Sequence, residues 1–350
     1  MRNINLAPLM LVILIVFSCK KDNAGTVPNN SQAKDVYVTW FTRVTGTGQN
    51  SIAEISKNEN TFPLGDGSTA TVANSIAISG VDVYVTGYES KDTNTIAKYW
   101  KNGEAVNLTD GSDVSIARGI AISGNDVWVA GNETIQLGNS TTKHVVAEYW
   151  KNGIKTMLTD GTTDVNATSI AISGSDIYIS GNETFNGSYV ARYWKNGNPV
   201  VLSDTAQSAF ASSIVVSAND VYVVGYLIDS SLTSAVYWKN GTLVELTEGV
   251  VRSLASSIAV SGTDVYVAGI EANASHINVA KYWKNGQSVD LSDGTNPAVG
   301  TSIAVSGNDV YVAGYEWNGF IYTPKYWKNG TAVVLSNSIN AVTTGICLSQ

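Results

Sequence analysis

Residues 75–111 read SIAISGVDVYVTGYESKDTNTIAKYWKNGEAVNLTDG, and the same unit recurs along most of the chain. Its first half returns at five further places, at intervals of 44, 50, 44, 44 and 45 residues. SIAIS and DVYV read as short strands separated by a Ser-Gly-x-Asp reversal, and AKYW and AVNL read as two more. Asn102-Gly103 favours the positive-φ hairpin that would join the last two strands. Each unit therefore predicts four antiparallel strands.

A repeat in the mid-forties built from four short strands is typical of one blade of a β-propeller. The two ends of the chain determine the number of blades. Residues 35–40 (DVYVTW) match a second strand that has no first strand before it, and residues 52–67 align without gaps to residues 96–111. Residues 345–350 (GICLSQ) match the missing first strand. Pairing these segments removes two exposed sheet edges. The sequence thus predicts an all-β, seven-bladed propeller over residues 35–350, with one blade closed by both termini.

The DVYVxG and YWKNG elements resemble those of bacterial β-propeller-repeat lipoproteins, and the resemblance covers nearly all of the mature chain. It implies an architecture that binders, scaffolds and enzymes share, so function does not follow from it.

The N-terminal residues have the features of an export signal. Arg2 precedes an apolar run over residues 6–17, which is short for a bilayer-spanning helix, and Ser18 stands directly before Cys19. We expect residues 1–18 to be a lipoprotein signal peptide, with Cys19 as the lipid attachment site and residues 19–34 as a flexible tether. The protein would then be exported and lipid-anchored to the cell envelope, at the outer membrane, facing the periplasm or the surface. A cleaved signal with an incidental cysteine is the alternative.

Composition narrows the partners. The formal net charge is −8 and the pI is near 4.8, which argues against non-specific nucleic-acid binding. We expect the protein to be a monomer. No cofactor is indicated; calcium could use the many carboxylates, but no dense D-x-D-x-D spacing occurs. Cys347 stands in a strand position held by alanine in other repeats, which predicts a small buried filler.

Most recurring side chains have structural explanations. The tryptophan of each YW pair is expected to pack between adjacent sheets. The aspartate that opens each second strand should stabilise its turn and pair with the lysine that closes the third strand. These aspartates are Asp82, Asp126, Asp176, Asp220, Asp264 and Asp309. The lysines are Lys57, Lys101, Lys151, Lys195, Lys239, Lys284 and Lys328.

The opposite face carries the variable loops, and glutamates recur there at the end of the second strand. They are Glu89, Glu133, Glu183, Glu271 and Glu316. Basic residues at the start of the third strand offset some of this charge, but the sequence predicts a net acidic, loop-rich face that could bind a ligand.

Aromatic residues that break the repeat mark a candidate site on that face. Trp40 stands where other repeats have Gly87 and its equivalents, and Trp317 follows Glu316 in the last repeat. Phe320 and Tyr322 are close to Trp317 in sequence. Exposed aromatics on adjacent blades suit a sugar ring or an apolar anchor of a protein. Alternatively, they seal the closure blade, where Ser56 replaces the usual tryptophan.

The leading hypothesis is a membrane-anchored binding or interaction module for a glycan or a protein. A carbohydrate-active enzyme, a polysaccharide lyase or glycosidase using the loop-face carboxylates, is the first alternative. A structural subunit of an envelope complex is the second. The sequence contains no nucleophile elbow, no phosphate-binding loop and no Cys/His ligand set, and therefore assigns no catalytic residue.

Overall fold

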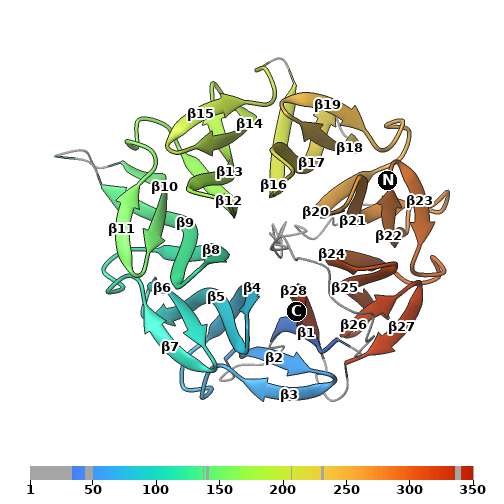
Figure 1. Cartoon of the computed structure of the whole chain (residues 1–350), viewed down its shortest axis with the longest axis horizontal. Coiled ribbons are helices and arrows are strands. Elements are labelled where there is room, and N and C mark those ends of the chain that lie inside the picture. The colour runs from blue at the N-terminus through green and yellow to red at the C-terminus, as the bar shows by residue number, and fades with distance from the viewer. Residues whose placement is uncertain are drawn as a thin grey trace, which may run out of the picture.

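The computed structural model describes residues 34–43, 50–136, 138, 142–205, 207–229, 232–335 and 340–349. Within them, seven four-stranded antiparallel sheets stand around a central axis, as the ring in Figure 1 shows. The predicted all-β, seven-bladed propeller is confirmed. The described residues contain no helix, and hence none long and apolar enough to cross a membrane. The expected signal peptide, the lipidated Cys19 and nearly all of the tether lie outside the described residues.

Every blade has the same strand order from the axis outward. The innermost strands are β28 (Ala341–Leu348), β4 (Thr71–Ser79), β8 (Ser115–Ser123), β12 (Val165–Ser173), β16 (Ser208–Ser217), β20 (Ser253–Ser261) and β24 (Ala298–Ser306). The second strands are β1 (Val36–Thr42), β5 (Asp82–Lys91), β9 (Asp126–Gln136), β13 (Asp176–Phe185), β17 (Asp220–Asp229), β21 (Asp264–Ala272) and β25 (Asp309–Trp317). The third strands are β2 (Ala53–Lys57), β6 (Asn94–Lys101), β10 (Lys143–Lys151), β14 (Ser188–Lys195), β18 (Leu232–Lys239), β22 (Asn278–Lys284) and β26 (Tyr322–Lys328). The outermost strands are β3 (Asn60–Pro63), β7 (Glu104–Asn107), β11 (Ile154–Met157), β15 (Asn198–Val201), β19 (Thr242–Glu245), β23 (Gln287–Asp290) and β27 (Thr331–Val334).

Blade 1 is closed by both ends of the described chain. Its strand order is β28-β1-β2-β3, so a C-terminal strand supplies the innermost position. Val36 pairs with Leu348, and the Ser349 amide donates to the Asp35 carbonyl at 2.9 Å. We number the remaining blades 2 to 7 in chain order, so that blade 1 lies between blade 7 and blade 2 (Figure 1). Cys347 is buried in this blade.

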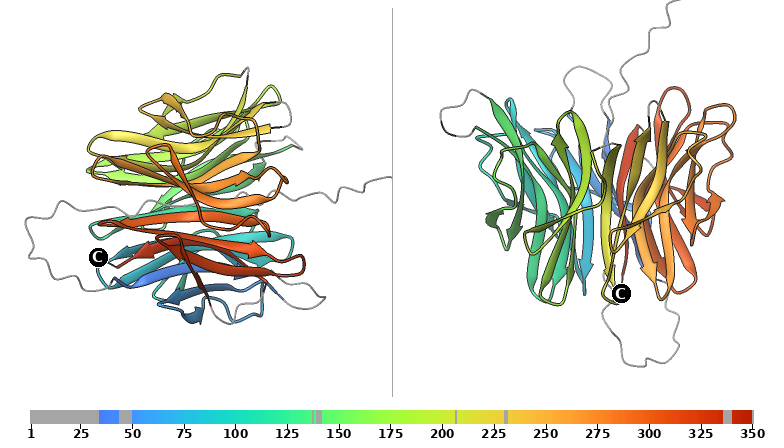
Figure 2. Two further views of the ribbon diagram at one scale, coloured as in Figure 1. Left: turned by 90° about the vertical axis from the view of Figure 1, so that its right-hand side faces the viewer. Right: turned by 90° about the horizontal axis from the view of Figure 1, so that it is seen from above.

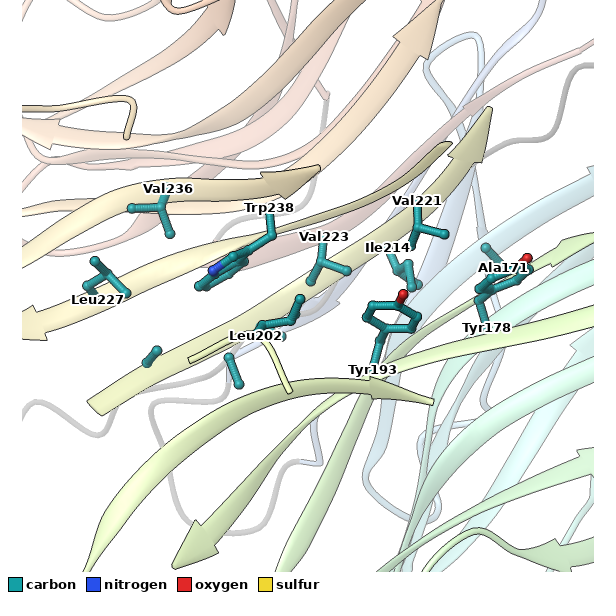
Figure 3. Packing of buried hydrophobic residues seen from close by; sticks show 13 residues of the cluster. Ala171, Tyr178, Tyr193, Leu202, Ile214, Val221, Val223, Leu227, Val236 and Trp238 are labelled. Atoms are coloured by element: carbon teal, nitrogen blue, oxygen red, sulfur yellow. The ribbon is translucent and has the colours of Figure 1, made fainter. Parts of the chain in front are cut away.

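The core consists of seven layers, one between each pair of neighbouring blades. In the layer shown in Figure 3, Trp238 of blade 5 packs with Tyr193 and Leu202 of blade 4. The equivalent tryptophans of blades 2, 3, 4, 6 and 7 lie in the corresponding layers and are at most a few per cent exposed. The predicted role of the YW tryptophans is therefore confirmed.

One face of the disc carries the two tight turns of each blade, and we call it the turn face. In blade 2, Lys101 Nζ lies 2.8 Å from Asp82 Oδ2, and Asn102 Nδ2 donates to Asp82 Oδ1 at 2.8 Å. Asn102 has a φ of 52°, and its Oδ1 accepts the Val83 amide. All seven blades repeat this Asp–Lys–Asn arrangement, which begins with Asp35 in blade 1. The predicted aspartate–lysine pairing is confirmed, and it neutralises the turn face.

The opposite face, which we call the loop face, carries the hairpins between second and third strands and the connections to the next blade. The side views in Figure 2 separate the two faces, with the C-terminus on the turn face. Since Asp35 belongs to a turn-face arrangement, the chain enters the propeller on that same side.

Candidate functional site

Trp40 does not lie on the surface. Its side chain is 0% exposed and packs in the layer between blade 7 and blade 1, and its indole Nε1 donates to Glu54 Oε2 at 2.7 Å. The expectation of an exposed Trp40 is wrong, and the alternative, that this tryptophan seals the closure blade, describes its position. Ser56, at the usual tryptophan position, is also buried.

The physical reason is that two neighbouring positions share one volume. In blade 2 the Trp100 ring covers Gly87, where an added Cβ would lie 3.1 Å from Trp100 Cζ3. In blade 1 the same pair of positions carries Trp40 and Ser56, so the large side chain comes from the second strand instead of the third. The layer is filled either way.

The five predicted glutamates all lie at the loop-face end of their blades, and each is paired with a cation. Glu89 pairs with Lys98, Glu183 with Arg192 at 2.5 Å, Glu271 with Lys281 at 2.5 Å and Glu316 with Lys325 at 2.7 Å. Glu133 pairs with Lys155 at 2.6 Å.

Hydroxyl groups complete several of these pairs. Thr69 donates to Glu89, and Thr163 donates to Glu183, both at 2.6 Å. Burial alone would raise the pKa of Glu89, but the hydrogen bonds from Lys98 and Thr69 hold it below its ordinary value. Four of these carboxylates tie the second strand to the third, and Glu133 ties it to the outermost strand. All five are already paired with cations, so they are poorly suited to attract a cationic ligand.

Blade 3 arranges its charges differently. Glu148 occupies the position that holds Lys98 in blade 2, and the cation is Lys155 on the outermost strand, 3.7 Å from Glu148 Oε2. Glu148 is 0% exposed, and neither carboxylate oxygen has a hydrogen-bond partner. Burial, followed by the neighbouring Glu133, raises the pKa of Glu148 to about 7.

The connecting aspartates stabilise their own turns. Asp66 Oδ1 accepts the amide and hydroxyl of Ser68, and Asp110, Asp160 and Asp293 make the equivalent backbone contact two residues on. No group of three His, Cys, Asp or Glu side chains within the described ranges is arranged to hold a metal ion.

The β25–β26 hairpin of blade 7 presents the remaining predicted aromatics on the loop face. The Trp317 and Tyr322 rings stack with their centroids 6.4 Å apart at 29°, and Tyr315 meets Tyr322 edge-on at 5.4 Å. Trp317 is 38% exposed, and Phe320 at the hairpin tip is 88% exposed. Asn318 Oδ1 accepts the amides of Phe320 and the following residue at 3.0 Å, which gives the tip a defined shape. The structure thus brings together three of the four predicted aromatic residues.

An arginine from the closure blade completes this corner. The Arg43 guanidinium lies over the Tyr322 ring, 4.8 Å from its centroid. Asn340, at the start of β28, links the two blades, since its backbone and side chain hydrogen-bond Arg43 and its Oδ1 accepts the Tyr322 amide. We call the group Arg43, Trp317, Phe320 and Tyr322 the aromatic corner.

A second aromatic group on the loop face was missed from the sequence. The rings of Tyr189, Phe210 and Tyr226 follow one another across blades 4 and 5, with centroid separations of 4.4 and 5.0 Å. Burial raises the pKa values of both Tyr226 and Tyr315 to about 12, and the positive charge of Arg252 opposes the shift at each. Arg252 directly precedes β20 of blade 6, and blade 6 stands between the blades that carry the two aromatic groups.

The signal for this second group was present but weak. Tyr189 and Tyr322 hold the same repeat position, as do Tyr226 and Tyr315. The recurrence of tyrosine at these two positions indicated that a second aromatic group could form on the loop face. Neither Arg43 nor Arg252 forms an ion pair with any residue that the structure describes. The loop face therefore carries aromatic rings with two uncompensated guanidinium groups along blades 4 to 7 and blade 1.

Comparison with known proteins identifies the architecture and nothing finer. No known family profile matches the chain, and no curated protein sequence is similar to it. Among solved structures, the chain is similar to a puromycin-hydrolyzing peptidase of Mycobacterium tuberculosis, with 13% identity over 87% of this chain and 52% of that one and a TM-score of 0.55. It is also similar to the Pyrococcus horikoshii acylaminoacyl peptidase, with 11% identity, 89% and 52% coverage and a TM-score of 0.51. The chain spans about half the length of these peptidases, and at such identity the similarity reflects the fold alone.

Proposed function

We propose that this protein is an envelope-anchored glycan-binding module whose ligand docks on the aromatic corner of the loop face. The observation that carries the proposal is the Trp317–Tyr322 stack beneath an uncompensated Arg43, beside the exposed Phe320. Flat aromatic surfaces bind the apolar faces of sugar rings, and a guanidinium group forms paired hydrogen bonds with a carboxylate. We therefore propose a glycan that contains an acidic sugar.

The orientation of the disc supports this role. The described chain enters on the turn face through Asp35, and the proposed lipid anchor at Cys19 precedes it by a short polar segment. An anchor attached on that side lets the turn face lie toward the membrane and leaves the loop face accessible to a ligand. The turn face is also self-neutralised, as expected for a surface with no charged ligand of its own.

The alternative of a glycosidase requires a carboxylic acid that can give up a proton to the leaving group. Each recurring glutamate is instead paired with a cation, and at Glu89 the hydrogen bonds from Lys98 and Thr69 outweigh burial, lower the pKa and favour the ionised form. A binding role therefore agrees better with these residues than the enzymatic one does.

A glycan array followed by calorimetric titration tests the proposal. We expect Trp317→Ala and Tyr322→Ala each to weaken binding of the best glycan at least about fivefold, since stacking contributes on the order of 1 kcal/mol or more per ring. Phe62→Ala, which removes an exposed aromatic from blade 1 away from this corner, is the matched control and should bind normally.

A variant at Arg43 tests whether the ligand contains an acidic or a neutral sugar. Arg43→Gln should reduce binding of the acidic glycan while leaving its neutral counterpart unchanged. Unaltered binding of every array hit by Trp317→Ala and Tyr322→Ala would show that the aromatic corner is not the site. If the wild-type protein bound a protein partner and no glycan, the ligand would be a protein instead of a glycan.

A further inference from the structure

The layer between blades 1 and 2 lacks a tyrosine that the other six layers contain. Beside each YW tryptophan stands a tyrosine that packs toward the next blade, as Tyr193 does in Figure 3. Its equivalents are Tyr99, Tyr149, Tyr237, Tyr282 and Tyr326. Blade 1 has Ile55 at this position, so one aromatic ring is missing from the layer toward blade 2.

A pocket occupies the place of the missing ring. Its volume is about 300 Å³, and its walls include Ile55 and Leu64 of blade 1 and Val83, Val85 and Trp100 of blade 2. Phe62, which pairs with Ile55 across the strands, does not refill the space, since it stands at the rim with 54% of its surface exposed. An apolar cavity of about 150 Å³ is large enough to bind benzene, so this pocket can hold a substituted aromatic ring.

The polar groups at the pocket correspond to those near the tyrosine hydroxyl in the other layers. In blade 2, Tyr84 and Lys101 lie close enough to influence the pKa of Tyr99, which burial raises. Their counterparts in blade 1 are Tyr37 and Lys57, and both line the pocket. The pocket therefore offers an apolar slot for a ring and polar partners for one hydroxyl group.

We propose that the pocket between blades 1 and 2 binds a small phenolic molecule, with its ring in the space that a tyrosine side chain fills at the other six layers. The apolar walls of the pocket provide the affinity, since binding removes the apolar surfaces of both the ring and the pocket from water. Lys57 and Tyr37 line the pocket and supply the polar groups for the phenol oxygen, while Lys57 Nζ also pairs with Asp35 at 2.8 Å. This site is independent of the aromatic corner on the loop face.

The probe is p-cresol, which reproduces the tyrosine side chain, and its binding is followed by saturation-transfer NMR with a titration. The wild-type protein should show saturable binding, and methylcyclohexane, which lacks the hydroxyl group, should bind more weakly. Ile55→Tyr restores the residue found in the other blades and fills the pocket from within. We expect it to weaken p-cresol binding at least about tenfold.

Trp317→Ala, on the loop face, should bind p-cresol like the wild type. If Ile55→Tyr does not fold, Val83→Phe narrows the pocket from the opposite wall and provides the same comparison. Absence of saturable binding to the wild type, or equal binding to the filled and unfilled proteins, would overturn the proposal.

Discussion

Replacing Glu148 with glutamine should make the protein more stable at and above neutral pH and leave its stability nearly unchanged below about pH 4.5. Glu148 is fully buried, its carboxylate oxygens have no hydrogen-bond partner, and Lys155 is bound more closely by Glu133 than by Glu148. Ionisation in this environment is costly, because the charge loses its hydration and meets a second carboxylate.

The magnitude follows from the raised pKa. Burial and Glu133 move the pKa of Glu148 from 4.5 to about 7 in the folded protein. Below 4.5 both folded and unfolded chains hold the proton, so the site has no effect on stability. Between 4.5 and 7 the unfolded chain releases the proton first, and the free energy of unfolding falls by about 1.4 kcal/mol per pH unit. The total loss is about 3 kcal/mol, and it remains constant above pH 7.

Urea denaturation of wild type and Glu148→Gln at several values between roughly pH 5 and pH 8 measures this difference directly. The advantage of the glutamine variant should grow across the interval toward about 3 kcal/mol. Glu104→Gln is the matched control, because Glu104 is exposed and pairs with Lys101 across the hairpin. The difference in stability between this variant and the wild type should not change with pH. A difference that does not change with pH would refute the reasoning, as would a variant that becomes less stable than the wild type at high pH.

Three further sets of experiments test the packing, the turns and the turn-face charges. Trp40→Gly should cost about 3 to 5 kcal/mol and Ser56→Trp about 1 to 3 kcal/mol, whereas the double variant, which recreates the arrangement of the other blades, should recover most of the loss in a double-mutant cycle. Glu59→Gly and Ala218→Gly should each raise the free energy of unfolding by about 1 kcal/mol in chemical denaturation, because these residues have φ values of 71° and 49° where other blades have glycine. Hydrogen bonds from lysine and asparagine lower the pKa of Asp82 and its counterparts below 3.8. The stability that these aspartates contribute is therefore present above pH 3.8 and should be lost as the pH falls below it. Circular dichroism in acid would detect this loss, and Asp82→Asn should make the stability less dependent on pH.

The sequence was sufficient for the architecture because a blade is a local structure. Turn signals such as Asn102-Gly103 and the alternation in strands such as residues 82–85 act over a few residues, and the period counts the blades. Even the closure of blade 1 could be predicted, because residues 345–350 supply the strand position that the N-terminal segment lacks. The contact between Asp82 and Lys101 followed from antiparallel neighbours within one blade.

The sequence was insufficient where a side chain depends on a neighbouring blade. Alignment shows that Trp40 departs from glycine and Ser56 from tryptophan, but not that both positions border one volume. Likewise, the stacking of Tyr189 on Phe210 joins separate repeats, and its geometry depends on the twist and spacing of two sheets. Such contacts require the three-dimensional ring and cannot be obtained from repeat positions alone.

Blade 1 contains two kinds of departure from the repeat, and the difference between them bears on function. Trp40 with Ser56 conserves the volume of its layer, so the exchange needs no explanation beyond packing. Ile55 and Glu59 are not compensated in this way, because one leaves a pocket and the other holds a conformation that glycine adopts at lower cost. A closed ring restrains each blade from both sides, so an uncompensated change can persist without disrupting the fold. The pocket beside Ile55 and the arginine-capped corner at Arg43 lie at opposite borders of this one blade, which makes blade 1 the part of the ring where specific binding is best sought.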